Sequence, residues 1–194
     1  MKNKFGFILI KPQLGENIGA SARALKNFGF KHLSITDPRD GWPNIKAKAT
    51  SVEAFDILKK TKVLTNTKLA VKNFDLVFSF SARKRHVNKK HVSMVNFLKI
   101  LSLTKSKKIG LMFGPEASGL SNYDLSFSNY VVQIPSSPKF RSLNLSHSVS
   151  LVCYEIFKLN NYKLLNQSSF EKDLGKKAKL TQILKLLELN LEKK

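Results

Sequence analysis

The sequence predicts an α/β fold in which a mostly parallel sheet is flanked by helices. Short apolar runs rich in β-branched and aromatic residues alternate with segments of helical periodicity, which is typical of a parallel sheet with helices on its faces. The length of 194 residues fits one domain better than two, and a hydrophobic fraction of 42% can build a sizeable core. No run approaches the ~20 apolar residues of a membrane span, and the first apolar run, residues 5–10, is too short for a signal peptide. We therefore expect a soluble, cytoplasmic domain without membrane association.

The first half of the chain opens with a strand and then alternates. Residues 5–10 form a continuous apolar run that stops at Lys11 and Pro12, as a buried strand does. Residues 18–28 have helical periodicity, and Asn17 directly before them can cap a helix. Further strands are expected at 33–36, 62–64 (the weakest) and 75–80, with helices at 51–59 and 67–73.

The second half continues the alternation. We expect helices at 91–101, 122–127 and 145–159, and strands at 109–113 and 130–134. Ser121 with Asp124 three residues on resembles a capping box for the short helix. Ser142 or Asn144 would cap the long final helix.

We divide the chain into a main domain, residues 1–162, and a C-terminal part, residues 163–194. Residues 166–169, Asn-Gln-Ser-Ser, indicate a linker. A helix is expected after it because apolar residues recur on one face at helical spacing, namely Leu180, Ile183, Leu184, Leu187 and Leu191. Such a stripe favours docking on the main domain or on a second copy of the chain, and an RNA-contacting element is the alternative.

The charge indicates a polyanionic partner. The chain has 34 Lys and Arg against 13 Asp and Glu, a formal charge of +21. Residues 83–108 hold nine Lys or Arg and no carboxylate, a patch that attracts phosphates without reading sequence. Nucleic acid is favoured as the partner over an anionic membrane. A general bias of the composition toward lysine is the other explanation of the charge. The expected RNA contacts are Arg83, Lys84, Arg85, Lys89 and Lys90.

Several enzyme classes lack their motifs here. There is no glycine-rich dinucleotide loop after the first strand, no P-loop and no nucleophile elbow. The four histidines show no metal-ligand spacing, and the lone Cys153 excludes both a disulfide framework and a cysteine-rich zinc module. We therefore expect neither a bound metal nor phosphate-driven chemistry.

Three segments carry residues that a scaffold does not require. Residues 15–23 open a helix just after the first strand, where parallel sheets form crevices, and contain Asn17 and Arg23. Residues 113–120 follow an apolar strand and combine two glycines and a proline with Glu116. Residues 139–146 are a polar loop that leads into the long final helix. Taken singly, each could be a helix cap, a surface residue or an ordinary loop.

Taken together, in this order and at these strand ends, the segments resemble the three motifs of SpoU-type (TrmH-like) RNA ribose methyltransferases of the SPOUT superfamily. Asn17, Ile18 and Gly19 with Arg23 resemble motif 1, residues 113–120 motif 2, and residues 142–145 motif 3. Residues 81–85, Ser-Ala-Arg-Lys-Arg, and the Tyr-Glu pair at 154–155 are most similar to the TrmJ-type tRNA methyltransferases, which act on the ribose of nucleotide 32 in the anticodon loop. The resemblance covers residues 5–160.

The resemblance implies a deep trefoil knot in the C-terminal part of the domain, a homodimer, and S-adenosylmethionine bound in the knot. It implies cofactor contacts, mostly through the backbone, from Phe80, Ser81, Ala82, Gly114, Ile134, Arg141, Ser142 and Leu143. Motif 1 would come from the partner subunit, so that the active site is shared between subunits.

The residues implied in catalysis are Arg23, Asn17, Ser142, Asn144 and Glu116. A ribose 2′-hydroxyl is a poor nucleophile at neutral pH, so the site must align it with the methyl group and help to remove a proton. Because a guanidinium resists deprotonation, we expect Arg23 to orient the phosphate and favour the developing alkoxide rather than act as the base. Asn17, Ser142 and Asn144 would set hydrogen bonds around it, and Glu116 would order the motif 2 loop or neutralise nearby cations rather than serve as the base.

The implied function is S-adenosylmethionine-dependent 2′-O-methylation of tRNA at nucleotide 32. TrmJ-type proteins usually carry a longer C-terminal extension than the about 30 residues that follow the core here, so rRNA or another tRNA position is the alternative target. A catalytically silent RNA-binding dimer is the alternative of another class, and the presence of all five polar residues argues against it.

Overall fold

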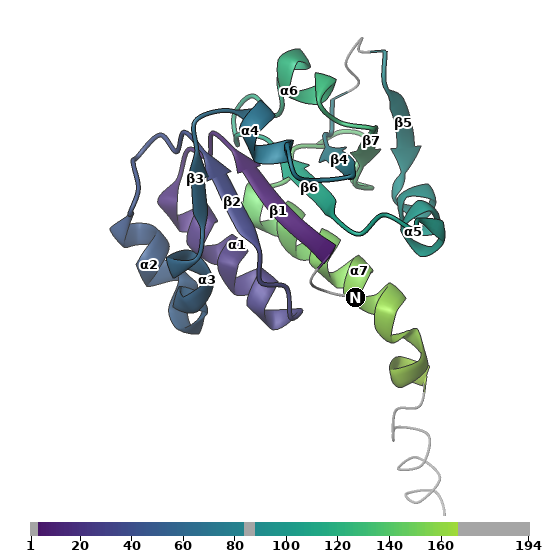
Figure 1. Ribbon diagram of the computed structural model, residues 1–194, viewed down its shortest axis with the longest axis horizontal. Coiled ribbons are helices and arrows are strands. Elements are labelled where there is room, and N and C mark those ends of the chain that lie inside the picture. The colour runs from purple at the N-terminus through teal and green to yellow at the C-terminus, as the bar shows by residue number, and fades with distance from the viewer. Residues whose placement is uncertain (1–3, 84–87, 167–194) are drawn as a thin grey trace, which may run out of the picture. The chain divides into compact units, whose positions relative to one another are not determined.

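The computed structural model describes residues 4–83 and 88–166, and they form one parallel sheet covered by helices on both faces (Figure 1). In these residues seven strands are ordered β3-β2-β1-β6-β4-β7-β5, and every neighbouring pair is parallel. The chain divides after Phe157, within the last helix, and the architecture below belongs to the first unit. The predicted α/β class with a mostly parallel sheet is confirmed.

The central strands follow the apolar runs of the sequence. The bounds are β1 (Phe5–Ile10), β2 (Leu33–Thr36), β3 (Lys62–Leu64), β4 (Leu76–Phe80), β6 (Ile109–Phe113) and β7 (Tyr130–Gln133). β1 and β6 are buried along their whole length. A strand covered on both faces reads as a continuous apolar run, so these two strands were predicted to the residue.

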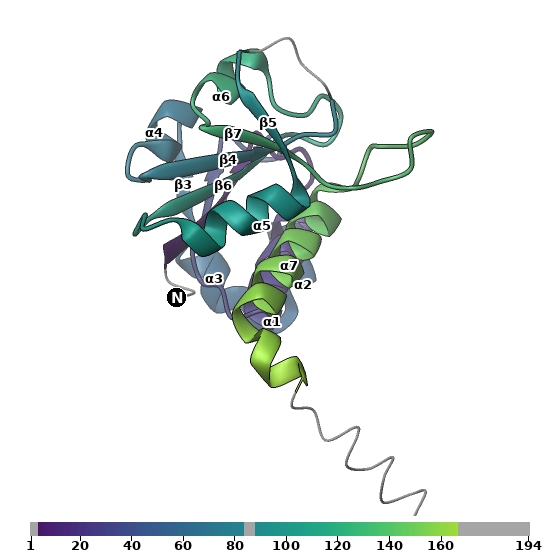
Figure 2. The ribbon, with the colours of Figure 1, turned by 90° about the vertical axis from the view of Figure 1, so that its right-hand side faces the viewer.

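The two faces of the sheet carry separate apolar cores, because successive strand residues point in opposite directions. Phe7 and Leu9 pack with residues of α1 (Gly15–Asn27), α3 (Phe55–Lys59), α5 (Met94–Leu103) and α7 (Leu145–Asn166). Ile8 and Ile10 pack with residues of α4 (Thr67–Val71) and α6 (Asn122–Ser126). Figure 2 shows α5, α7 and α1 gathered on the first of these faces. None of the helices within residues 4–83 and 88–166 is long and apolar enough to cross a bilayer.

The helix expected at 91–101 is wrong in its first turn. Residues Lys90–Ser93 form the edge strand β5, which pairs with β7, and α5 begins only at Met94. Val92 is the only buried residue of this strand, and its other side chains are exposed. A strand with one buried residue has almost no apolar pattern, and its pairing with β7 fixes its conformation.

The helix expected at 51–59 is broken, and a helix before it was missed. The structure has α2 (Ile45–Ser51), a short 3₁₀ turn (Val52–Ala54) and α3. Asn44 caps α2 by accepting from the backbone N–H groups of Lys46 and Ala47, both at 3.0 Å. At Gly19 of α1 a Cβ would overlap the Ala47 carbonyl oxygen, so this glycine lets α1 and α2 pack closely.

Candidate active site

A cavity of about 310 Å³ lies at the carboxyl ends of β4, β6 and β7. These strands are neighbours in the sheet, with Phe80 of β4 level with Phe113 of β6 and with Val132 of β7. The loops that leave the three strands therefore meet at one edge of the sheet, where ligands bind in open α/β sheets. All eight residues expected to contact the cofactor line this cavity: Phe80, Ser81, Ala82, Gly114, Ile134, Arg141, Ser142 and Leu143.

The cavity has an apolar floor and a polar rim. The rings of Phe80 and Phe113 stack with their centroids 4.7 Å apart, and Ile134 and Leu143 add further apolar surface. Hydroxyl groups, cations and one carboxylate stand around this floor, from Ser81, Arg83, Glu116, Arg141, Ser142 and Ser148. An apolar body with a few fixed polar groups is the usual composition of a cofactor site.

The motif 2 loop, residues 113–120, folds back tightly on itself. At Gly114 a Cβ would overlap the backbone of Gly119 and Leu120, so only glycine fits there. The N–H of Gly119 donates to the Pro115 carbonyl at 2.8 Å, and Gly119 itself has φ +65°. This closed loop presents Glu116 toward the start of α1.

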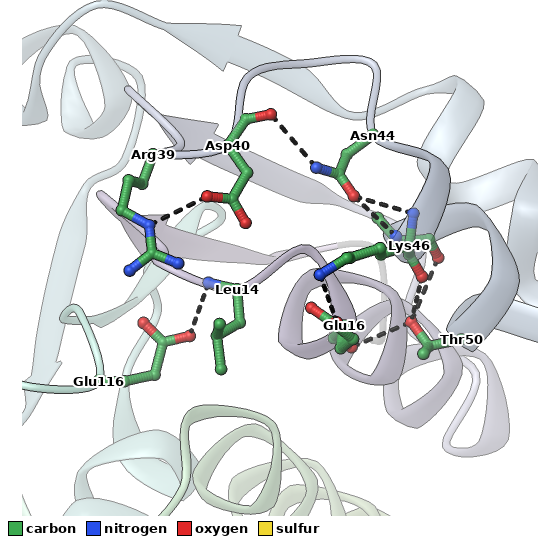
Figure 3. Close-up of polar contacts among 9 residues, drawn as sticks. Leu14, Glu16, Arg39, Asp40, Asn44, Lys46, Thr50 and Glu116 are labelled. Carbon is green, nitrogen blue, oxygen red and sulfur yellow. Dashed lines mark hydrogen bonds and ion pairs between the residues drawn. The ribbon is translucent and has the colours of Figure 1, made fainter.

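Glu116 joins the motif 2 loop to motif 1. Its carboxylate accepts from the backbone N–H of Gln13 at 2.8 Å, from that of Leu14 at 3.4 Å, and from the Asn17 Nδ2 at 2.6 Å. Figure 3 shows the contact with Leu14, the residue just before α1. Leu14 offers no side-chain cap, so Glu116 supplies the acceptor and the negative charge that a helix N-terminus favours.

Asn17 extends this connection to motif 3. Its Oδ1 accepts from the Asn144 Nδ2 at 3.0 Å, so one buried amide links Glu116 and Asn144. The prediction that Asn17 caps α1 is wrong: the helix begins at Gly15, and Asn17 lies inside its first turn. The sequence could not show this, because the side chain is engaged by partners about a hundred residues away.

Asn144 caps the final helix, and it is one of the two residues, Ser142 or Asn144, that were predicted for this role. Its Oδ1 accepts from the Ser146 N–H at 2.9 Å and from the His147 N–H at 3.3 Å. Ser142, the other choice, instead lines the cavity. Asn144 therefore fixes the start of α7 and, through Asn17, the place of motif 3 beside α1.

Arg23 does not reach this cavity. It lies on α1, is exposed, and makes no hydrogen bond or ion pair with the residues that the structure describes. Four of the five residues expected in catalysis (Asn17, Glu116, Ser142 and Asn144) lie together, whereas the fifth points elsewhere.

The residues expected to contact RNA are spread around the cavity and the sheet edge. Arg83 lines the cavity and donates to the Ala117 carbonyl at 3.3 Å. Lys89 donates to the Ser126 carbonyl at 2.7 Å, and Lys90 is exposed at the start of β5. Lys84 and Arg85 lie outside the described residues.

One cation near the site was not predicted from the sequence. Arg39 follows the carboxyl end of β2 and stands beside Glu116 in Figure 3. Its Nε donates to Asp40 at 3.0 Å, and this hydrogen bond raises the pKa of the guanidinium. Its place after the carboxyl end of a parallel strand was the available signal, although no motif drew attention to it.

Known proteins resemble this chain in sequence and in fold. Residues 4–154 match the model of the SpoU rRNA Methylase family. The chain is 34% identical to the tRNA (cytidine-2′-O-)-methyltransferase TrmJ of Methanocaldococcus jannaschii, over 77% of this chain and 66% of that protein. The crystal structure of TrmJ from Z. mobilis ZM4 has 37% identity and a TM-score of 0.75, covering 79% of this chain and 69% of that one.

A more distant structure shares the fold. It is the SpoU methyltransferase AviRb from Streptomyces viridochromogenes in complex with the cofactor AdoMet, with a TM-score of 0.60 and 17% identity, covering 82% of this chain and 59% of that one. The chain spans 61–72% of the length of the first curated relatives that it matches. Because the family model matches well over half of the chain, the protein belongs to the SpoU rRNA methylase family.

Proposed function

We propose that this protein transfers a methyl group from S-adenosylmethionine to the 2′-oxygen of a ribose in tRNA. The observation that carries the proposal is the cavity in which the loops after β4, β6 and β7 meet, joined to α1 by the hydrogen bonds from Glu116 through Asn17 to Asn144. The names of the TrmJ relatives support tRNA as the substrate.

The cavity residues fit the proposed cofactor. The cavity volume of about 310 Å³ falls within the range of small-molecule and cofactor sites. The cavity floor, formed by Phe80 and Phe113, suits an adenine ring. Arg83 and Arg141 supply cations for a carboxylate, and Ser81 and Ser142 supply hydroxyl groups for a ribose. When bound, the cofactor supplies an activated methyl on a sulfonium, which the ribose oxygen accepts while the thioether departs and the hydroxyl proton is released.

Each catalytic residue then has a proposed part in positioning. Glu116 holds the motif 2 loop against α1, since its oxygens already accept three hydrogen bonds, and this occupation argues against its service as the base. Asn17 and Asn144 hold motifs 1 and 3 together. Arg23 would orient the RNA phosphate and favour the alkoxide that develops on the ribose.

Arg23 supports a dimeric active site. Because it is exposed and lies away from the cavity of its own chain, a site that uses it must take it from a second copy. We therefore propose a homodimer in which α1 of one subunit completes the cavity of the other.

A trefoil knot is part of the same proposal. Only residues 81–89 connect β4 to β5, although β7 lies between these parallel strands. Because β7 follows both strands in the chain yet lies between them in the sheet, the later part of the chain has to pass the 81–89 connection to reach its place, which supports a threaded path. Nucleotide 32 is our proposed target, with rRNA or another tRNA position as the alternative.

The test is methyl transfer from labelled S-adenosylmethionine to unmodified tRNA, mapped by nuclease digestion and mass spectrometry. Methylation confined to the ribose of nucleotide 32 is the expected result. Transfer to rRNA alone would keep the chemistry and overturn the substrate. No transfer, together with no heat on titration of S-adenosylhomocysteine, would favour a silent RNA-binding dimer.

A further inference from the structure

A second hollow, which the proposed reaction does not use, lies beside α2 and α3. It has a volume of about 530 Å³ and is lined by Trp42, Ile45, Lys48, Phe55, Leu58 and Lys59, which we call the Trp42 groove. Trp42 and Phe55 are partly buried against the core, whereas Ile45 is 82% exposed. The groove therefore offers a fixed aromatic surface at the protein exterior.

Two cations border this surface without carboxylate partners. The Lys48 and Lys59 ammonium groups lie 5.2 and 5.1 Å from the centre of the Phe55 ring. Neither lysine has an ion pair among residues 4–83 and 88–159, whereas Lys46 pairs with Glu16 and Lys26 with Asp56. Both ammonium groups lie over the Phe55 ring, which leaves Trp42 as the aromatic face for a flat ligand ring, with two cations nearby for an anionic group.

We propose that the Trp42 groove binds an unpaired nucleotide of the RNA substrate, with its base against Trp42 and its phosphate at Lys48 and Lys59. This inference rests on the proposed function, which supplies a polyanion whose loops contain unstacked bases. Stacking on aromatic side chains with neighbouring cations is how single-stranded nucleic acid is bound without reading sequence.

The loop between β2 and α2 connects this groove to the active site. Residues 37–44 begin at the carboxyl end of β2 and place Arg39 beside Glu116 (Figure 3). Trp42, which lines the groove, follows Arg39 by three residues. This one loop therefore places a cation, Arg39, near the active site and an aromatic side chain, Trp42, in the groove. The net charge of +21 favours RNA over a protein partner, which is the competing occupant.

Trp42 itself reports occupation, because it is the only tryptophan in the chain. Tryptophan emission of the full-length protein is followed while unmodified tRNA, a short single-stranded RNA or an acidic peptide is added. We expect quenching by both RNAs, weakening steeply with salt. Quenching by the peptide alone, or unchanged emission while tRNA binds by filter retention, would overturn the inference.

A second experiment removes the positive charges of the groove and leaves its aromatic residues in place. The variant Lys48→Ala/Lys59→Ala is compared with Lys68→Ala/Lys72→Ala, which removes the same charge from exposed lysines in and just after α4. We expect the groove variant to bind tRNA roughly tenfold more weakly, with a salt slope lower by about 1 to 2, and to raise KM for tRNA at unchanged kcat. Equal behaviour of the two variants would overturn the inference even if methyl transfer is normal. If wild-type protein neither binds nor methylates tRNA, the proposed function fails as well.

Discussion

The role of Glu116 can be decided by two substitutions, because its carboxylate is the common acceptor for motif 1. Glu116→Ala leaves the Gln13 N–H and the Asn17 amide without their acceptor, two charge-assisted bonds at 2.8 and 2.6 Å. Such bonds each stabilise by roughly 1.5–3 kcal/mol, and partial exposure lets water replace part of this. We expect a loss of about 2 kcal/mol in the free energy of unfolding, which lowers Tm by roughly 4–8 °C.

Glu116→Gln separates positioning from proton transfer. The amide keeps one acceptor oxygen and loses the charge, so we expect about 1 kcal/mol of destabilisation and most of the turnover retained. A general base would instead lose turnover equally in both variants, since an amide accepts no proton at neutral pH. Stability is measured by denaturant unfolding, and kcat and KM by methyl transfer to tRNA.

The control is Glu53→Ala, an exposed carboxylate on the short 3₁₀ turn, with an expected change within about 0.5 kcal/mol. If Glu116→Ala unfolds like this control, Glu116 does not hold α1. If Glu116→Gln is as inactive as Glu116→Ala although it is as stable as the wild-type protein, Glu116 acts as the general base and the positioning role is refuted.

Three further outcomes are expected. Arg23→Ala should lower kcat/KM for tRNA on the order of 100-fold while calorimetric affinity for S-adenosylhomocysteine is kept, and a loss of cofactor binding would contradict this division. Asn144→Ala should cost about 1–2 kcal/mol in unfolding free energy, because α7 loses its cap and Asn17 its partner, whereas the exposed His147→Ala should cost little. Burial raises the pKa of the Cys153 thiol above its ordinary value of 9.0, so the unfolded chain alone loses this proton as the pH rises past about 9. The free energy of unfolding should then fall by up to about 1.4 kcal/mol per pH unit above this pH. Cys153→Ala should remove this pH-dependent loss, and urea unfolding of both proteins at alkaline pH measures the difference.

Most strands could be predicted from the sequence, including the exposed edge strand β3, whereas the edge strand β5 could not. β1 and β6 are continuous apolar runs, and their bounds were predicted to the residue. β5 was read as helix because only Val92 is buried, and its pairing partner β7 follows about forty residues later. The sequence of residues 90–93 alone does not show that a strand so far along the chain will pair with them.

The candidate site shows the same division. The eight residues expected to contact the cofactor share one cavity because their motifs follow particular strand ends, and parallel strands bring those ends to one edge. The position of Asn17 inside α1 was not predicted, since Asn before an apolar periodic segment is also the usual signal for a cap. Arg39 and the Trp42 groove were not predicted either, because no local pattern distinguishes them from an ordinary loop. The C-terminal helix expected within residues 163–194 stays a prediction and lies outside the described residues.

The hydrogen bonds of Asn17 explain why an amide is needed at this position. Its Nδ2 must donate to the Glu116 carboxylate, which can only accept, and its Oδ1 must accept from Asn144. An aspartate of the same shape would place a second carboxylate against Glu116, and an apolar residue would leave both neighbours without a partner. One buried side chain therefore sets the relative positions of all three motifs. A substitution at Glu116, Asn17 or Asn144 should for this reason also alter the cavity. The changes in the free energy of unfolding from substitutions at two of the three should not be additive.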